Sequence, residues 1–334
     1  MPTNLISRAR LSTLLASVRS LRIAVVGDAM LDVYLTGDVE RVSPEAPVPV
    51  VRVRDRRYAL GGAANVAQNV AALGATADLV ATVGSDESAK RLRDLLKKQG
   101  SGSRGLVPVN RPTTTKTRIV ARAQQVVRVD EEIDDDCTGA EIAKLNTAVS
   151  RAVKECDALI LEDYNKGVLV APVIAHAMGA ARKKGIPVVV DPKYRNFFSY
   201  TGATIFKPNR RELEAALGAA VDVEHPRTLP GLVEKLGVEA ILLTLSERGM
   251  ALIEKGATMK EGVHRIPTTA RAVYDVVGAG DTVTAYLAAM LAGGATALEA
   301  AIIANFAAGV EVGKLGAATV TTGEVLAAYD AHGK

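Results

Sequence analysis

A glycine-rich run that ends in an aspartate is the part of the sequence best suited to phosphoryl transfer. Gly278, Ala279 and Gly280 precede Asp281, and a helical pattern of small and apolar residues follows over 284–292. Such a helix start leaves backbone N–H groups free to face an anion, and the helix dipole adds partial positive charge. The same positive end should keep Asp281 ionised, so that it can orient a hydroxyl and accept its proton. The run predicts an anion hole at 278–280 with Asp281 as catalytic base.

Taken alone, this run also fits an ordinary glycine-rich turn with an aspartate near a helix start. It is not the dinucleotide fingerprint, because Val283 stands where a third glycine is needed. The Walker A pattern is missing too. Protein-kinase loop signals are absent as well, since His264–Ile266 has Ile where that motif needs Asp. Other elements must therefore support the phosphate reading.

Two further polar elements suit a polyhydroxylated ligand. Gly61 and Gly62 stand before Asn65 at a second helix start, where Asn65 could bind a ligand or simply cap its own helix. Asp28 and Asp32 follow the first expected strand. A carboxylate can accept two hydrogen bonds from sugar hydroxyls, which we expect of Asp32. For Asp28 we expect a turn or capping role.

The elements that must position these residues alternate along the chain. Apolar, β-branched runs predict strands at 22–26, 78–83, 158–161, 187–190, 204–207 and 240–245. Helical patterns cover 65–73, 88–99, 140–154, 172–184 and 211–217. This order predicts an α/β fold with a doubly wound, mostly parallel sheet covered by helices on both faces. Ligands of such sheets bind at the carboxyl ends of the strands.

Residues 33–58 and 113–130 interrupt this alternation. Both carry polar and apolar residues in turn, which predicts exposed antiparallel strands. We interpret them as insertions that form a small β-sheet lid over a single domain spanning 1–334. The lid could exclude water from the site, serve as an oligomer contact, or do both.

The amino-acid composition limits the kinds of binding partner that are expected. Lysine and arginine number 41 against 37 acids, and the resulting net charge of +4 gives no argument for nucleic acid or an anionic membrane. Two cysteines and four scattered histidines predict neither a disulfide framework nor a histidine metal site, and a cytoplasmic location is expected. The uncharged stretch 282–298 is too short and too rich in small residues for a membrane span. The basic segment 1–22 could be a transit peptide, but an amphipathic helix packed beside the first strand is the favoured interpretation.

Five elements, in this order, resemble the signatures of the ribokinase-like carbohydrate kinases. They are Gly61–Asn65, Lys207–Glu212, Thr244–Gly249, Asp275–Thr282 and Ala304–Gly309. The resemblance implies ATP as co-substrate and Mg²⁺ organised through water by Asn209 and Glu212. It also implies nucleotide contacts from Thr244, Ser246 and Gly249, and an adenine pocket lined by Asn305. A monovalent cation, K⁺, is implied beside the glycine-rich loop, with Asp275 as a side-chain ligand.

A narrower resemblance is to the heptose-7-phosphate kinases of lipopolysaccharide inner-core synthesis. It is carried by residues 28–32, 41–50, 124–130 and 162–167. It implies phosphorylation of D-glycero-D-manno-heptose 7-phosphate at C1, and a homodimer through the lid. Some relatives add a nucleotidyltransferase domain with a His-x-Gly-His motif. This chain has no such motif before Lys334, so it resembles the single-function form.

A phosphosugar needs cations away from the ATP end. Arg122 on the lid and Lys193 after a strand are our candidates, and Asp163 could hold sugar hydroxyls. For any one basic residue, solvated surface charge is the usual alternative.

Three other functions can be compared with the sequence motifs. A related sugar or nucleoside kinase with a different acceptor would carry the same motifs. A nicotinamide-dependent oxidoreductase would need a Gly-x-Gly-x-x-Gly after an early strand, which is absent. A non-catalytic binding protein of this fold is disfavoured because Asp281, Asn209 and Glu212 are all in place.

Overall fold

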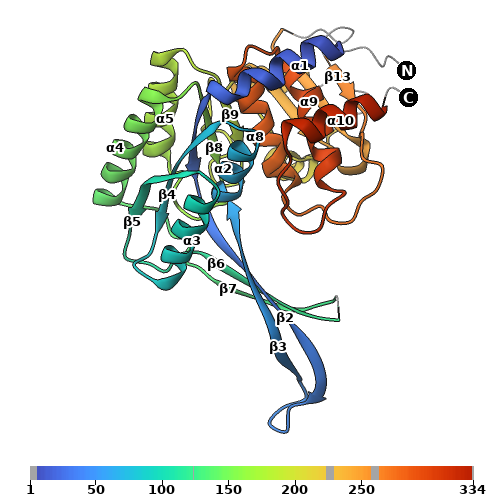
Figure 1. Cartoon of the computed structure of the whole chain (residues 1–334). Coiled ribbons are helices and arrows are strands. Elements are labelled where there is room, and N and C mark those ends of the chain that lie inside the picture. Colours follow the sequence, from blue (N-terminus) through green and yellow to red (C-terminus); the bar gives the residue numbers. More distant parts are fainter. Residues whose placement is uncertain (1–5, 123, 223–228, 257–262, 333–334) are drawn as a thin grey trace.

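A nine-stranded sheet forms the centre of the molecule (Figure 1). The computed structural model describes residues 6–122, 124–222, 229–256 and 263–332. The strand order is β13-β12-β11-β10-β9-β8-β1-β4-β5. Strand β12 is antiparallel to both of its neighbours, β11 and β13, and all other neighbouring strands are parallel. The bounds are β1 (Arg22–Gly27), β4 (Thr76–Val83), β5 (Gly102–Pro108), β8 (Ala158–Glu162), β9 (Val188–Asp191), β10 (Ile205–Phe206), β11 (Ala240–Thr244), β12 (Met250–Glu254) and β13 (Val263–Ile266).

Helices cover both faces of this sheet, which confirms the predicted doubly wound fold. One core contains the buried sides of α1 (Arg8–Ser17), α2 (Ala63–Ala72), α3 (Glu87–Lys98), α8 (Ala279–Ala292), α9 (Ala297–Glu311) and α10 (Thr322–His332). The other contains α4 (Gly139–Glu155), α5 (Ala171–Lys184), α6 (Arg210–Leu217) and α7 (Pro230–Leu236). In β1, Ile23 and Val25 enter the first core and Ala24 and Val26 the second, as alternation along a strand requires.

The six predicted strands are all present, but the sheet contains three more. The missed strands are β5, which includes two glycines, and β12 and β13 at one edge of the sheet. The strand predicted over 204–207 is reduced to Ile205–Phe206, because Lys207 already belongs to the turn into α6. The uncharged stretch 282–298 is divided between α8 and α9, which are separated at Gly293–Gly294.

The lid is a second, four-stranded sheet that projects from the body (Figure 1). Its strand order is β3-β2-β6-β7, with β2 (Ala29–Val42), β3 (Pro49–Gly62), β6 (Thr115–Ala121) and β7 (Gln124–Glu131). Both hairpins are antiparallel as predicted, but the prediction was wrong for β2 and β6, which pair in parallel. Both of these strands start at the body, where Leu31 lies opposite Thr115. The β2–β3 pairing also begins at Ala29, so the lid takes in more than residues 33–58.

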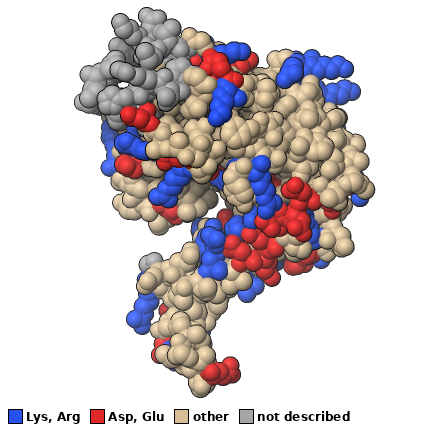
Figure 2. All heavy atoms as spheres, turned by 180° about the vertical axis from the view of Figure 1, so that it is seen from behind, with Lys and Arg blue, Asp and Glu red and all other residues tan. Residues whose placement is uncertain are grey.

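Ion pairs fasten the base of the lid to the body. Figure 2 shows acidic side chains gathered where the lid joins the rest of the molecule. Lys116 on β6 pairs with Asp130 and Glu132, and Lys166 of the body also pairs with Glu132, at 2.6 Å. Because Lys116, Lys166 and Glu132 are mostly shielded from solvent, this network holds the lid base more firmly than isolated surface pairs would.

The N-terminal segment forms the expected amphipathic helix from residue 8 onward. Leu11, Leu14 and Leu15 of α1 are buried, and Arg8 pairs with Asp330 of α10 at 2.7 Å. A short 3₁₀ turn then leads directly into β1. Among the residues that the structure describes, no helix has both the length and the apolar character needed to cross a membrane.

Candidate active site

Asp281 lies at the start of α8, and two side chains from distant segments hold it. Asn65 on α2 donates its Nδ2 hydrogen to Asp281 Oδ2 at 2.6 Å, and the Tyr164 hydroxyl donates to Oδ1 at 3.0 Å. Gly278 precedes the helix with a φ of 98°, a conformation that favours glycine. Both carboxylate oxygens of Asp281 are therefore oriented before any ligand arrives.

The local surroundings correct the expected ionisation of Asp281. The helix start was expected to keep this carboxylate at a low pKa. Instead, burial raises the pKa of Asp281 to about 6, with Asp191 adding to the rise, while hydrogen bonds from Asn65 and Tyr164 oppose it. Only 6% of the residue is exposed, so lost hydration outweighs the helix dipole. The carboxylate is still mainly ionised at pH 7.

Asn65 does not take the capping role, one of the two roles considered for it. Helix α2 begins at Ala63 after Gly62, so Asn65 lies inside the first turn and does not cap the helix. Its amide is directed to Asp281 instead. The contact arises because α2 and α8 pack side by side, a pairing of segments that no local pattern announces.

Three carboxylates converge beside this contact. Oxygen atoms of Glu162, Asp191 and Asp281 all lie within 4.8 Å of one another, and Lys207 Nζ lies 2.8 Å from Asp191 Oδ2. Neither oxygen of Glu162 accepts a hydrogen bond within the part of the chain that the structure describes. Burial, followed by the charges of Asp191 and Asp281, raises the pKa of Glu162 well above its usual value.

The expected site residues did not include Glu162, Asp191 or Lys207. The first two end strands β8 and β9, and Lys207 directly follows β10. A polar residue at the carboxyl end of an apolar strand was the available signal, because parallel strand ends meet at one edge.

The expected sugar-binding residues come together at the base of the lid. Asp32 on β2 pairs with Arg118 on β6, with Nη1 and Oδ1 separated by 2.5 Å. A Cβ on Gly61 would lie 2.9 Å from Asp32 Oδ2, and one on Gly62 would lie 2.4 Å from the Asp28 carbonyl oxygen. The glycine pair therefore lets β3 pass close to both aspartates. Arg118 was not among the expected site residues.

Asp28 and Asp163 have structural partners. Asp28 accepts hydrogen bonds from the backbone N–H groups of Tyr164, Lys166 and Val168, so it has a structural role, but in the segment after β8 rather than in its own turn or a helix cap. Asp163 accepts from the Tyr200 hydroxyl and from the Asn165 N–H, both at 2.7 Å. Since Asp163 is buried and both oxygens are occupied, the structure does not support the expectation that it holds sugar hydroxyls.

The two expected phosphate-binding cations are not brought together. Lys193 pairs with Glu212 and lies 5.3 Å from the centre of the Tyr164 ring, so it belongs to the expected nucleotide side. Arg122 lies in the exposed β6–β7 turn, more than 10 Å beyond Arg118 at about 3.3 Å per residue. The expectation that both residues bind the phosphate of the sugar is therefore corrected. Lys193 lies beside the carboxylate of Glu212, whereas Arg122 lies in the β6–β7 turn of the lid.

The residues expected to bind the nucleotide lie at the start of α6 and at or after the end of β11. Asn209 and Glu212 cap α6 reciprocally, through contacts of 2.9 and 2.8 Å, and Thr244 bridges to Asn209. A Cβ on Gly249 would lie 2.1 Å from the Ile266 carbonyl oxygen, so only glycine fits beside β13. Ser246, next to it, has a φ of 55° and is exposed.

A cavity of about 240 Å³ lies beyond these loops. Asn305 on α9 donates to the Pro267 carbonyl oxygen at 2.8 Å and so holds the segment that precedes the cavity. The lining includes Thr269, Tyr274, Phe306, Gly309 and His332. Its small and aromatic residues suit a flat, largely apolar ring such as a purine.

Asp275 ties together the backbone around the glycine-rich loop. Its carboxylate accepts from the Val277 N–H at 3.0 Å and from the Gly316 N–H at 3.1 Å. Glu311 lies beneath, where a Cβ on Gly278 would be 3.2 Å from its Oε1, and burial raises the pKa of Glu311 to about 8. The carboxylates of Asp275 and Glu311 offer oxygen atoms, which are ligands that an alkali cation accepts.

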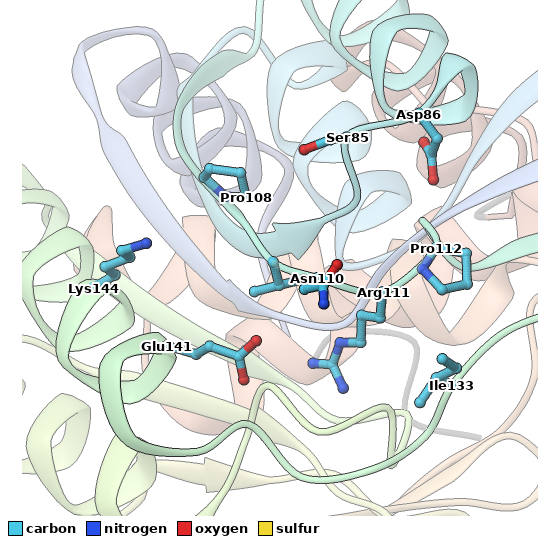
Figure 3. A pocket seen from close by; sticks show the side chains of 10 residues that line it. Ser85, Asp86, Pro108, Asn110, Arg111, Pro112, Ile133, Glu141 and Lys144 are labelled. Carbon is cyan, nitrogen blue, oxygen red and sulfur yellow. The ribbon is translucent and has the colours of Figure 1, made fainter.

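A wider, more open hollow of about 800 Å³ lies elsewhere (Figure 3). It is lined by Asp86 at the start of α3, by Asn110 and Arg111 after β5, and by Glu141 and Lys144 of α4. Arg111 is held there by the Asp135 carbonyl oxygen and Cys137 Sγ. None of the expected site residues lines this hollow.

Relatives of known sequence cover most of this chain. The bifunctional protein HldE of Azorhizobium caulinodans is 46% identical over 322 residues, which cover 95% of this chain and 66% of that protein. HldE of Granulibacter bethesdensis is 46% identical over 316 residues, covering 93% and 65%. The chain thus spans slightly less than two thirds of the length of these relatives.

Solved structures establish the fold. Ribokinase of Arabidopsis thaliana, complexed with ribose and ATP, superposes with a TM-score of 0.72 at 22% identity, covering 93% of this chain and 99% of that one. Phosphofructokinase-2 of Escherichia coli, in complex with potassium, gives 0.75 at 17% identity, covering 94% and 99%. The model of the pfkB family carbohydrate kinases matches residues 20–322. The chain therefore belongs to the pfkB family of carbohydrate kinases and is a sugar kinase.

Proposed function

We propose that this kinase transfers the γ-phosphoryl group of ATP to O1 of D-glycero-D-manno-heptose 7-phosphate, giving the 1,7-bisphosphate for lipopolysaccharide inner-core heptose synthesis. The choice of acceptor is supported by the similarity to the HldE proteins over most of this chain. The observation that carries the chemistry is the buried Asp281 carboxylate, held by Asn65 and Tyr164 at the start of α8. The reaction would take place in the cytoplasm.

Asp281 is the proposed base. Asp281 would take the proton of O1 as O1 attacks the γ-phosphorus and the bond to the ADP oxygen breaks. Gly278, Ala279 and Gly280 would stabilise the transferring group with backbone N–H groups and the positive end of α8. Lys207, which is buried beside Asp191, adds positive charge close by. Asp32, Asn65 and the Gly61–Gly62 backbone would bind the sugar hydroxyls.

ATP would lie along the wall from α6 to α9. Asn305 and the 240 Å³ cavity would receive the adenine, while Thr244, Ser246 and Gly249 would border the phosphates and ribose. Asn209 and Glu212 present oxygen atoms, which suit Mg²⁺ held through water. When bound, Mg²⁺ would neutralise phosphate charge. K⁺ is proposed beside Asp275, whose carboxylate is held by the backbone N–H groups of Val277 and Gly316.

The lid has two proposed roles. By closing over the sugar it would exclude water and so limit wasteful hydrolysis of ATP. It also exposes apolar side chains, among them Val42, Val48, Val53, Val127 and Val129. Exposed valines on edge strands favour pairing with a second copy, so we propose a homodimer through the lid.

An acceptor panel tests the proposal. ADP release would be measured with heptose 7-phosphate, ribose, fructose 6-phosphate and adenosine, and the position of the new phosphate would be read by ³¹P NMR. We expect the highest kcat/KM with heptose 7-phosphate and a new signal at C1. A higher kcat/KM with any other acceptor would instead establish the alternative, a related sugar or nucleoside kinase.

A further inference from the structure

An aromatic ring between two arginines lies on the lid, one step beyond the expected sugar site. Tyr34 on β2 lies opposite Arg57 of β3 on one side and opposite Arg118 of β6 on the other. The two guanidinium carbons lie 4.7 and 5.3 Å from the centre of the Tyr34 ring. We infer that Arg57 and Arg118 form the subsite for a phosphate that the acceptor already carries. This inference rests on the proposed function and concerns the same site.

The row formed by Arg57, Tyr34 and Arg118 faces the active site, not the solvent on the other side of the lid. Alternate residues of a strand share a face, so Tyr34 lies on the same face as Asp32. The opposite face is covered at the lid base by α3, where Arg91 lies 5.0 Å from the ring centre of Tyr58. Tyr58 lies opposite Val33, which has the other orientation. The Arg57 side chain therefore extends over the site.

Contacts connect this row to the glycine-rich loop. A Cβ on Gly316 would lie 3.1 Å from Arg57 Nη2, and the Gly316 N–H donates to Asp275. The next residue, Ala317, lies against Gly278, where a Cβ would be 3.2 Å from the Ala317 Cβ. Arg57 thus lies between the lid and the segment that supports the proposed anion hole.

The spacing fits an acceptor that is phosphorylated at the end away from O1. Asp32 and Tyr34 are two residues apart on β2, which corresponds to about 7 Å along the strand. That is the scale of a sugar ring with its exocyclic carbons. With the ring hydroxyls on Asp32 and O1 directed to Asp281, the far end of a heptose would reach the arginine row.

The charges of the row suit a phosphate monoester. Arg118 has one contact with Asp32, through Nη1, so its remaining N–H groups are available. Arg57 is exposed and has no carboxylate partner within the described residues. Stacking on Tyr34 would hold both guanidinium planes while their edges donate hydrogen bonds to phosphate oxygens. Arg57 would supply net positive charge for the phosphate, while Arg118, whose charge is balanced by Asp32, would supply further N–H donors.

Substitution of Arg57 tests the inference, and Arg56 supplies the matched control. Arg56 is the adjacent residue on β3, is also exposed, and has the opposite orientation. The kcat/KM of Arg57→Gln and Arg56→Gln would be measured with heptose 7-phosphate and with unphosphorylated heptose, together with the KM for ATP. Arg118→Lys, which keeps a charge near Asp32, would be measured in the same way.

The expected result is a loss of selectivity. Arg57→Gln should lower the preference for the phosphorylated over the unphosphorylated heptose about tenfold or more, because one charge-assisted contact is lost. Arg118→Lys should lower it as well, and Arg56→Gln should leave it within a factor of about two. Thermal unfolding of each variant separates these effects from misfolding.

Two kinds of result would overturn the inference. If the wild-type enzyme prefers heptose 7-phosphate but Arg57→Gln keeps that preference, or loses activity equally with both sugars or through ATP, the subsite is wrong while the proposed function stands. If the wild-type enzyme prefers an acceptor without a phosphate, the proposed function fails and the subsite falls with it.

Discussion

Asn65 donates a 2.6 Å hydrogen bond to Asp281, across 216 residues of sequence. The bond joins the glycine-rich starts of α2 and α8 and fixes one oxygen of the proposed base. Tyr164 fixes the other oxygen. Asp281 is thus oriented by protein donors, and an attacking hydroxyl would meet a carboxylate whose position is already set.

Replacing Asp281 tests its role as the base. Asp281→Asn keeps the shape of the side chain but removes the proton acceptor, so kcat should fall by about 10²- to 10⁴-fold. ATP affinity, measured by calorimetry, should stay nearly unchanged, because the proposed ATP contacts lie elsewhere. The asparagine variant should also fold normally. A loss of kcat below about threefold would remove Asp281 from the base role.

Replacing Asn65 tests whether the hydrogen bond matters. Asn65→Ala removes a donor that favours the ionised form of Asp281, so the pKa of Asp281 should rise further. We expect kcat to fall at pH 7 by about tenfold and the acid limb of the pH–rate profile to move to higher pH. Gln68→Ala serves as the control, since Gln68 lies on the same helix and contacts Asn65 but not Asp281. An acid limb at the wild-type position in Asn65→Ala would contradict this account.

The wild-type pH profile follows from the raised pKa of Asp281. A base must be ionised, so kcat/KM should be low at pH 5, pass half of its maximum near pH 6, and level off above pH 7. An unperturbed aspartate would already be ionised at pH 5. Initial rates from pH 5 to 9, at constant ionic strength, distinguish the two cases. An acid limb of kcat/KM centred near pH 4 would show that the pKa of Asp281 is not raised in the free enzyme.

Much of the scaffold could be predicted, because apolar strands and glycine-bounded helix starts are local patterns. The six inner strands and the run 278–281 were found in this way. Contacts between distant segments could not be predicted. Arg118 lies on β6, and Arg122 lies in the turn that follows this strand. Only the register of β6 with β2 shows that Arg118 meets Asp32. Glu162 likewise looks like any polar strand end until β8, β9 and α8 are placed together.

Glu162→Gln tests the cost of the unpartnered carboxylate. The pKa of Glu162 is higher in the folded state than in the unfolded state. Protonated Glu162 therefore stabilises the fold fully only at a pH below the unfolded-state pKa, and this contribution is lost as the pH rises through the folded-state pKa. The glutamine variant escapes this loss. Its melting temperature should therefore exceed that of the wild type at pH 8, by at least about 2 °C, and the gap should narrow toward pH 4.5. An equal gap at both pH values would mean that the charge of Glu162 is not responsible.

Gly62→Ala tests the backbone that brings the lid to the base. Gly62 has a φ of 55°, and a Cβ there would lie 2.4 Å from the Asp28 carbonyl oxygen, which is backbone and cannot move aside cheaply. Gly218→Ala is the reference variant, because Gly218 has a φ of 65° and a ψ of 20°, with open space around its Cβ position, whereas Gly62 has a ψ of −136°. We expect Gly62→Ala to lower the free energy of unfolding in urea by about 2–4 kcal/mol, and Gly218→Ala by about 1 kcal/mol from backbone strain alone. Kinase activity should fall only in Gly62→Ala, since that residue also sets the position of Asn65. Equal losses of stability in the two variants would remove both the close approach to Asp28 and the unfavourable ψ of Gly62 from the explanation.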